Sequence, residues 1–380
     1  MRRRADRPLR VLVVGQNVRH IAASASRAGH RVFAADCYND LDLAESAFRS
    51  ILLGADPSIP GDLGRSAELI IREVVEGDLI DRLVLGPGIE EMKVGGVEVL
   101  NNPPQKISLV SDKLWLGRWL EREGFPGVPT HPLGEEGDHR GFPLMVKPRK
   151  GAGGVENRLV FTEEELAEVA GDLIVQEMAV GTPASVSVVA DGEGAVAISA
   201  NEQLIGTGWL GGSGFRYCGN VSPLDSSIDA SAVGEMMDIG EEIAVRLGLV
   251  GSNGIDFVIT ESGPVVLEVN PRFQGSLDAV EISTGMNVFQ AHLLSFDGSL
   301  PDRPKPRGFG GRGVIFAKSD IKIEADLRTV TASIADVPRQ GTIAKRGDPL
   351  SSILSFGEDR KGAMDLLKRR SSAVYRAFRL

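Results

Sequence analysis

The sequence contains few of the residues that cross-link small proteins or hold zinc. Among its 380 residues are two cysteines, Cys37 and Cys218, which stand far apart and outside any CxxC pair. We therefore expect neither a disulfide framework nor a thiolate zinc site. The five histidines have no metal-ligand spacing, and the HExxH motif is absent.

Long apolar runs are also missing. No run approaches the roughly 20 residues that a membrane-spanning helix needs. The basic start, Met1 to Arg10, leads into "VLVVG", which is too short for a signal-peptide core and predicts a strand instead. We interpret Arg2 to Arg4 as a solvated tail, and we expect a cytoplasmic protein without a membrane partner.

Positive charge is scarce as well. The formal net charge is −10, which argues against a nucleic-acid partner because such proteins normally present a basic face. With 42% hydrophobic and 25% charged residues, the composition is typical of a soluble globular protein. A chain of 380 residues is too long for one hydrophobic core, so we expect two or three domains.

The common glycine motifs of nucleotide sites lack their usual context. GxGxxG occurs at 206–211 and 308–313, but neither copy opens an evident helix, so we discard both as dinucleotide sites. The turn at Gly15 lacks the later glycines of that motif. Walker A and GxSxG sequences are absent, which leaves P-loop and serine-hydrolase functions without support.

The first hundred residues do carry a clear pattern, in which strands and helices alternate. "LRVLVVG", "HRVFAADCY" and "DRLVLGPG" predict strands, and "VRHIAASASRAG" predicts a helix that ends at Gly29. Strand, helix and strand in succession indicate a parallel sheet of the doubly wound kind.

The rest of the chain mixes the two element types differently. We predict a helix at 111–124 with Ser111 or Asp112 as N-cap, and a second helix with a capping box formed by Thr162 and Glu165. A long helix is predicted at 230–249, and a closing helix from Glu358. Strands are predicted at 142–148, 173–178, 185–191, 313–321 and 326–334.

The stretch "GIDFVITESGPVVLEVNPR" reads as a β-hairpin whose two arms both alternate in polarity. A three-residue loop at 261–263, with glycine last, predicts a register in which Asp256, Glu268 and Asn270 converge on one face. A two-residue loop would instead move Asp256 to the opposite face. The predicted pairs are Thr260 with Pro264, Val258 with Val266, and Asp256 with Glu268.

Two carboxylates and an amide oxygen at close range repel one another unless a cation lies between them. Oxygen ligands of this kind suit magnesium, which favours phosphate as a further ligand. Taken alone, the same groups are more typical of a half-exposed hairpin that faces water.

A magnesium–phosphate site also needs fixed positive charge and backbone donors. "LMVKPRKGAGG" offers both, because Lys147 leaves a strand and the loop 151–154 can approach phosphate oxygens with its N–H groups. Lys113 is a second candidate cation. Flexible glycine turns and solvated lysines are the common alternatives.

In this order, "SDK", "PLMVKPRKGAGG", "VQEM" and "GIDFV…VVLEVNPR" resemble the ATP-grasp superfamily over roughly residues 100 to 300. The branch that looks most similar is that of biotin carboxylase and carbamoyl-phosphate synthase, including archaeal-type predicted ATP-dependent carboligases. The resemblance implies an α/β and α+β protein with a doubly wound pre-ATP-grasp domain at 1–105. A two-subdomain ATP-grasp domain would follow at 106–305, with a mobile lid at about 130–205, and a small β-rich domain at 306–380.

The resemblance also implies roles for individual residues and for the cofactors ATP and Mg²⁺ or Mn²⁺. Arg272 would stabilise the phosphoryl group in flight, as electrostatics would also assign. The metal ligands would be Asp256, Glu268 and Asn270. The nucleotide would be bound by Lys113, Lys147, Gly151, Gly153, Gly154, Gln176, Glu177 and Met178.

The substrates are less legible. By family position, Arg216 and Tyr217 would lie near the second substrate, where Arg216 could pair with a carboxylate. A surface arginine on a plain glycine-rich loop is the alternative. The biotin carboxylase pattern has a glutamate for bicarbonate chemistry where this chain has Ser276, so that reaction fits less well.

The function we expect is therefore that of an ATP-dependent carboxylate–amine ligase. It would activate an acid as an acylphosphate, release ADP and phosphate, and form an amide after attack by an amine. Carboxylation through carboxyphosphate is one alternative, and a non-catalytic nucleotide-binding regulator is another. The partners would be small-molecule substrates, and related enzymes are often homodimers, although no sequence feature here indicates an interface.

Overall fold

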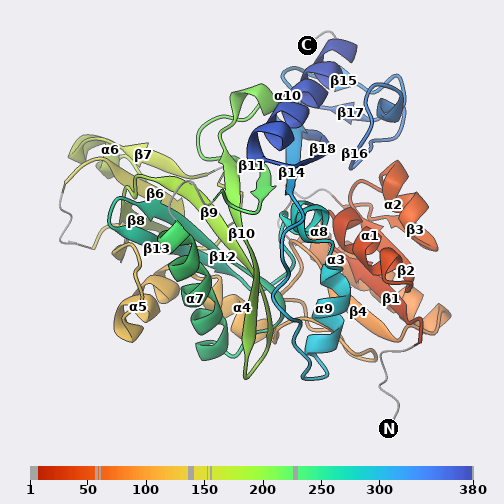
Figure 1. Cartoon of the computed structure of the whole chain (residues 1–380), viewed down its shortest axis with the longest axis horizontal. Coiled ribbons are helices and arrows are strands. Elements are labelled where there is room, and N and C mark those ends of the chain that lie inside the picture. The colour runs from red at the N-terminus through yellow and green to blue at the C-terminus, as the bar shows by residue number, and fades with distance from the viewer. Residues whose placement is uncertain are drawn as a thin grey trace.

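The computed structural model describes residues 7–378 except 56–58, 60, 136–140, 152, 155 and 226–229. The predicted solvated tail at Arg2 to Arg4 lies outside this range. Figure 1 shows an N-terminal segment and a small sheet on opposite sides of a long central sheet, with the C-terminal helix above.

The N-terminal segment forms a four-stranded parallel sheet in the order β3-β2-β1-β4, which confirms the predicted doubly wound pattern. Apolar side chains of β1 and β2 alternate between the two faces, so one face packs on α1 and α9 and the other on α3. Gly29 follows α1 with a φ of +84°, as its predicted role as helix terminator requires. The elements are β1 (Arg10–Val14), α1 (Arg19–Arg27), β2 (Arg31–Asp36), α2 (Leu41–Ser46), β3 (Arg49–Leu52), α3 (Asp62–Gly77) and β4 (Arg82–Leu85).

Two helices, α4 (Pro104–Val110) and α5 (Lys113–Glu123), lead from this segment to the small sheet. That sheet is antiparallel, in the order β5-β8-β6-β7, and has its own apolar cluster. Its elements are β5 (Thr130–Pro132), β6 (Leu144–Pro148), β7 (Arg158–Val160), α6 (Glu163–Ala167) and β8 (Leu173–Glu177). The small sheet thus ends at Glu177, whereas we predicted a lid that extends to about residue 205.

The strands between 182 and 205 belong instead to the central sheet, because they pair with β12 and β11 rather than with the small sheet. This eight-stranded sheet has the order β13-β12-β9-β10-β11-β14-β18-β16. Its strands are β9 (Thr182–Asp191), β10 (Ala195–Ile205), β11 (Tyr217–Ser222), β12 (Val250–Thr260), β13 (Gly263–Asn270), β14 (Phe309–Phe316), β16 (Ile334–Ala335) and β18 (Pro349–Gly357). A single sheet therefore crosses the boundary proposed at residue 306, and the division into domains stays a prediction.

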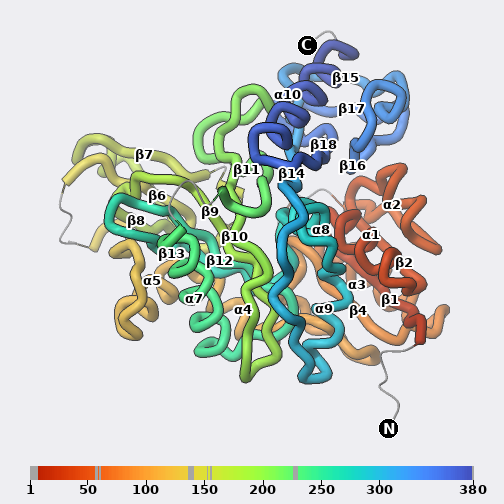
Figure 2. The backbone as a smooth tube through the Cα atoms, in the orientation of Figure 1, coloured from red at the N-terminus to blue at the C-terminus, as the bar shows by residue number. Residues whose placement is uncertain are grey.

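Helices cover the central sheet and join it to its neighbours (Figure 2). The predicted long helix is α7 (Ala230–Arg246), which packs on β9 and β10 in the largest apolar cluster. On the side of the N-terminal segment lie α8 (Leu277–Thr284) and α9 (Val288–Ser295), and α10 (Arg360–Ala377) covers β14 and β18. No helix among the described residues is both long and apolar enough to cross a bilayer.

The prediction of a strand at 326–334 is wrong. That stretch contains the 3-10 helix η3 (Leu327–Thr329), capped by Asp326, and only the first residue of β16, Ile334. Its alternating apolar residues belong to a compact turn, in which Leu327 is buried, and not to one face of a sheet. The remaining short elements are η2 (Gly208–Leu210) and the two-stranded pair β15 (Ile321–Lys322) and β17 (Ile343–Ala344).

Candidate active site

The hairpin of β12 and β13 is the frame of the site, and its register differs from the prediction at the turn. Thr260 pairs with Gly263, so the loop has two residues rather than three, and the predicted pairs Thr260–Pro264 and Val258–Val266 are wrong. Asp256 nevertheless pairs with Glu268. A β-bulge between Asp256 and Phe257, with Leu267 as the extra residue on the opposite strand, restores the alignment that a two-residue loop alone would have lost.

The bulge also changes which side chains face the site. Val266 and Val269 are buried, while Leu267 turns toward the same cavity as Glu268. A strict period of two would have placed Leu267 on the opposite face from Glu268. An apolar side chain is thereby added to the wall that carries the carboxylates.

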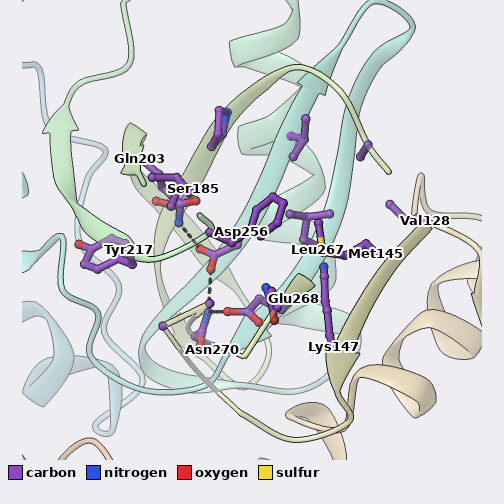
Figure 3. A pocket seen from close by; sticks show the side chains of 18 of the residues that line it. Val128, Met145, Lys147, Ser185, Gln203, Tyr217, Asp256, Leu267, Glu268 and Asn270 are labelled. Atoms are coloured by element: carbon purple, nitrogen blue, oxygen red, sulfur yellow. Dashed lines mark hydrogen bonds between the residues drawn. The ribbon is translucent and has the colours of Figure 1, made fainter. Parts of the chain in front are cut away.

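The predicted acidic face is present. Asn270 Nδ2 donates to Asp256 Oδ2 at 3.2 Å and to Glu268 Oε1 at 3.3 Å, as the dashed lines of Figure 3 show. Gln203, on β10, donates its Nε2 to Asp256 Oδ1 at 2.9 Å. Three strands of the central sheet, β10, β12 and β13, therefore bring two carboxylates and two amides together.

The pKa values of the two carboxyl groups are shifted in opposite directions. Burial and the negative charge of Glu268 raise the pKa of Asp256 well above its ordinary value. Burial opposes ionisation of Glu268 too, but the cation of Lys113 and hydrogen bonds from Asp256 and Asn270 lower its pKa below the ordinary value. These opposite shifts favour the protonated form of Asp256 and the ionised form of Glu268.

Two buried lysines face this acidic pair. Lys113, at the start of α5, places its Nζ 3.4 Å from Glu268 Oε2 and donates to the carbonyl of Gly151 at 2.8 Å. Lys147 projects from β6, and burial, reinforced by the nearby cation of Lys113, lowers its pKa to about 8. Figure 3 shows Glu268 and Asn270 between Lys147 on one side and Tyr217 on the other.

The start of α5 is fixed by its N-cap, one of the two residues predicted for that role. The Asp112 carboxylate accepts from the backbone N–H groups of Leu114 and Trp115 and from both Nε and Nη2 of Arg149. Because Arg149 follows β6 directly, this pair ties the lysine-bearing helix to the lysine-bearing strand.

A cavity of about 580 Å³ lies between the hairpin and the small sheet, a size typical of ligand sites. One part of its wall is largely apolar, with Val128, Met145, Met178, Val258 and Leu267, and another carries the amides, carboxylates and lysines described above. The chemistry of the wall suits a ligand with a flat apolar part and an anionic part.

Most predicted site residues line this cavity. They are Lys113, Lys147, Gly153, Gly154, Gln176, Glu177, Met178, Tyr217, Asp256, Glu268, Asn270 and Arg272. Gly151 is adjacent through its carbonyl bond to Lys113 but is not part of the wall, and Ala152 of the same loop lies outside the described residues.

Arg216 is placed elsewhere, so the predicted contact between this residue and a substrate carboxylate has no support. Its Nη1 donates to the carbonyl of Gly347 at 2.6 Å, and its guanidinium lies over the ring of Phe316, 4.7 Å from the centroid. In a strand, successive side chains point to opposite faces, so the start of β11 turns Tyr217 into the cavity and its neighbour Arg216 away.

Sequence reasoning missed several polar groups of the wall. Ser185, Gln203, Asn220 and Gln274 line the cavity from four different segments. Gln274 continues the period-two series of Glu268, Asn270 and Arg272, and that spacing could have indicated it. The others lie on the successive strands β9, β10 and β11, which reach the hairpin only because β9 pairs with the distant β12, so no local pattern points to them.

The residues fit a divalent cation of the magnesium type. Asp256 and Glu268 supply carboxylate oxygens, and rotation of the Asn270 amide would bring its Oδ1 to the same place. The described residues hold no cluster of three or more His, Cys, Asp or Glu that could bind a metal alone. A cation here would therefore need oxygen atoms from a phosphate or water to complete its shell, as magnesium usually has.

Comparison with known proteins finds a family model that covers much of this site. Residues 110–276 match the model of the ATP-grasp domain, which confirms the predicted resemblance over this range. The chain is 25% identical over 363 residues to an uncharacterized protein of Methanocaldococcus jannaschii, covering 91% of this chain and 88% of that one. It is 24% identical over 252 residues to the arginine-specific carbamoyl phosphate synthase large chain of Geobacillus stearothermophilus, of which it spans only 24%.

Solved structures share the fold at low sequence identity. The biotin carboxylase domain of Hydrogenobacter thermophilus 2-oxoglutarate carboxylase has a TM-score of 0.76 at 17% identity, covering 96% of this chain and 89% of that one. For an L-amino acid ligase from Bacillus licheniformis these values are 0.70, 16%, 97% and 98%. For N5-carboxyaminoimidazole ribonucleotide synthetase from Thermotoga maritima they are 0.68, 17%, 96% and 98%. The predicted fold class is thereby confirmed.

Proposed function

We propose that this protein is an ADP-forming carboxylate–amine ligase. It uses ATP to convert an organic acid into an acylphosphate, and an amine then displaces phosphate to form an amide. The observation that carries the proposal is the opposition of two buried lysines, Lys113 and Lys147, to the carboxylate pair of Asp256 and Glu268 in one cavity. Lysines that face carboxylates across a cavity suit a triphosphate with its metal ion.

The nucleotide would lie along the wall just described. Its adenine would contact the apolar side chains near Gln176 to Met178, and its phosphates would lie between Lys147 and the hairpin, under Gly153 and Gly154. A magnesium or manganese ion held by Asp256, Glu268 and Asn270 would neutralise phosphate charge and orient the triphosphate. The structure of a similarly folded biotin carboxylase domain in complex with MgADP is consistent with these ligands.

The reaction needs ATP because a carboxylate is a poor electrophile. An oxygen of the acid attacks the γ-phosphorus, the bond from that phosphorus to the β–γ bridging oxygen breaks, and ADP leaves. The amine then attacks the acyl carbon, inorganic phosphate leaves with the carbon–oxygen bond electrons, and the amine gives up a proton. Arg272 would balance the negative charge that develops during the first transfer. Closure of the glycine loop would exclude water from the intermediate.

Carboxylation through carboxyphosphate is the competing reaction, since several structures of this fold are biotin carboxylases. Ser276 argues against it. This residue is buried and its Oγ pairs with that of Ser187 at 3.2 Å, so the position carries no base for bicarbonate. ADP release that depends on bicarbonate and on no organic acid would favour the competing reaction. A non-catalytic nucleotide-binding role would instead give nucleotide binding with no turnover under any condition.

The decisive experiment measures ADP and phosphate release from the full chain with pools of organic acids and amines. We expect release only when both pools are present, and subdivision of the active pools would then identify the two substrates. The proposal also includes a homodimer, in line with the biotin carboxylase dimer among its structural relatives, and light scattering of the same sample tests it.

Arg272→Ala is the variant that tests the assigned chemistry. We expect turnover to fall by about a thousandfold or more, because the charge of the phosphoryl group in flight loses its compensating cation. ATP affinity should remain nearly intact. Unchanged turnover in this variant would contradict the role of Arg272.

A further inference from the structure

The N-terminal sheet sends one segment to the wall of the ATP-grasp cavity. This segment, 86–91, follows β4 at the carboxyl edge of the sheet, next to the turn after β1. The two connections touch, since a Cβ on Gly15 would lie 2.9 Å from the backbone of Gly86. In open α/β sheets, the edge between strands whose connections run in opposite directions commonly contacts ligands.

Glu90 in this segment makes a specific contact with the proposed catalytic arginine. Its Oε1 lies 2.9 Å from Arg272 Nε, and its Oε2 accepts from the backbone N–H of Gly88 at 2.8 Å. The side chains of Glu90 and Arg272 are only 16% and 21% exposed. A carboxylate fixed at both oxygens and largely shielded from water holds its partner more firmly than an exposed ion pair does.

The other hydrogen bonds of Arg272 are weaker, and a ligand can replace their acceptors. Its Nη1 donates to the carbonyl of Phe273 at 3.1 Å, and its Nη2 donates to Asn270 Oδ1 at 3.2 Å. Both acceptors are neutral, so a charged phosphate oxygen would compete with them successfully. The carboxylate of Glu90 contacts Nε, and the two Nη groups stay available for the ligand.

We propose that Glu90 is a positioning residue for Arg272, which makes the N-terminal segment part of the phosphoryl-transfer apparatus. By fixing Nε, Glu90 limits the guanidinium to orientations in which its Nη groups can reach the transferred phosphoryl group. An arginine orientation fixed before the reaction needs no reorganisation when charge develops. The inference rests on the proposed function, because it assigns Arg272 to the phosphoryl group.

The test uses ligands that need no acid or amine substrate. Calorimetry measures how tightly the full chain binds MgADP, and how much aluminium fluoride, which mimics the phosphoryl group in flight, tightens that binding. The variants are Glu90→Gln, Arg272→Ala and the double variant. Glu98→Gln is the matched control, because Glu98 pairs with Arg82 at 3.0 Å in the N-terminal part of the chain but is 57% exposed.

We expect Glu90→Gln to leave MgADP affinity unchanged and to reduce the aluminium fluoride effect by about tenfold, as loss of one charge-assisted hydrogen bond would do. Arg272→Ala should reduce the effect further, and adding Glu90→Gln to that variant should change nothing more. Glu98→Gln should behave as wild type.

Other results overturn the inference in distinguishable ways. If aluminium fluoride tightened MgADP binding as much in Glu90→Gln as in the wild type, Glu90 would not position Arg272, and the proposed function would remain intact. The same conclusion would follow if Glu90→Gln reduced the aluminium fluoride effect equally in the presence and in the absence of the Arg272 side chain. If Glu90→Gln weakened the binding of MgADP alone as much as it reduced the aluminium fluoride effect, Glu90 would have a general structural role instead. Failure of the wild type to bind MgADP would refute the proposed function, and with it the inference. A wild type that binds MgADP but gains nothing from aluminium fluoride would remove the role of Arg272 and hence that of Glu90.

Discussion

At the scale of single residues, the opposite pKa shifts of Asp256 and Glu268 predict that metal binding depends on pH. Metal must displace the proton whose pKa on Asp256 is raised by burial and by Glu268. We therefore expect the affinity for Mg²⁺, measured with ADP bound, to rise with pH while Asp256 loses its proton. Calorimetry in two buffers of different ionisation heat should detect proton release in the wild type and none in Asp256→Asn. Binding without proton release in the wild type would contradict the assignment.

Lys147 predicts that the affinity for the nucleotide depends on pH in the opposite direction. Its pKa is lowered to about 8, so its ammonium group is lost as the pH rises through that value in the free protein. Phosphate oxygens bind the charged form, and we expect ADP affinity to fall by about tenfold per pH unit above 8. Lys147→Arg should remove this dependence, because its guanidinium stays protonated. A wild-type affinity that is constant from pH 7 to 10 would be incompatible with a phosphate contact.

Site residues that lie close together in the sequence could be predicted from it, and contacts between residues from distant parts of the chain could not. Asp256, Glu268 and Asn270 could be grouped because a hairpin places them together over 15 residues. Glu90 contacts Arg272 across 182 positions, and no periodicity in either segment indicates that pair. Arg216 lies beside the carbonyl of Gly347, 131 positions away, and not in the cavity wall, and no local pattern indicates that contact either.

At the scale of elements, the N-cap of α5 is expected to stabilise both the helix and the site. Asp112→Ala removes the acceptor of the Leu114 and Trp115 N–H groups, and we expect the free energy of unfolding to fall by about 1 kcal/mol. Asp112→Asn should retain most of the cap. Both variants lose the ion pair with Arg149, which holds the start of α5 in place. Lys113 would then be displaced, and both variants should bind ADP more weakly. Urea denaturation and calorimetry check the two effects, and equal destabilisation by both variants would argue against the cap.

Elements with a strong period and defined ends were predicted well, among them the parallel strands, α5 and α7. The bulge at Leu267 was not, because the sequence fixes neither the loop length nor the position of an extra residue in an alternating strand. The sequence also did not indicate that the small sheet ends at Glu177. Strands β8 and β9 are separated by only four residues, and tertiary pairing alone decides which sheet each one joins.

At the scale of the whole molecule, a buried network of charges connects the N-terminal segment, the central sheet and the C-terminal segment. Arg19 on α1 donates to both oxygens of Asp278 on α8, at 2.9 and 2.6 Å, and its Nε donates to Asp336 at 2.9 Å. Arg312 on β14 donates to the same Asp336 at 2.9 Å and to the carbonyl of Gly275, which lines the cavity. Packing around the active site therefore depends on segments more than 250 residues apart.

Asp278→Ala tests this network, because it removes the closest carboxylate partner of the buried Arg19, which keeps Asp336 and Asp42, and leaves Arg312 paired with Asp336 alone. We expect the free energy of unfolding at pH 7 to fall by about 3–5 kcal/mol, the usual cost of breaking a buried pair. The Arg19 and Arg312 cations lower the pKa of Asp278 and Asp336 despite their burial, so the network's contribution exists above the ordinary aspartate pKa. It should be lost as the pH falls below about 4 in the wild type, and this acid-dependent loss should be smaller in the variant. Urea denaturation at several pH values measures both effects, and a loss under 1 kcal/mol at pH 7 would mean that apolar packing alone joins the three segments.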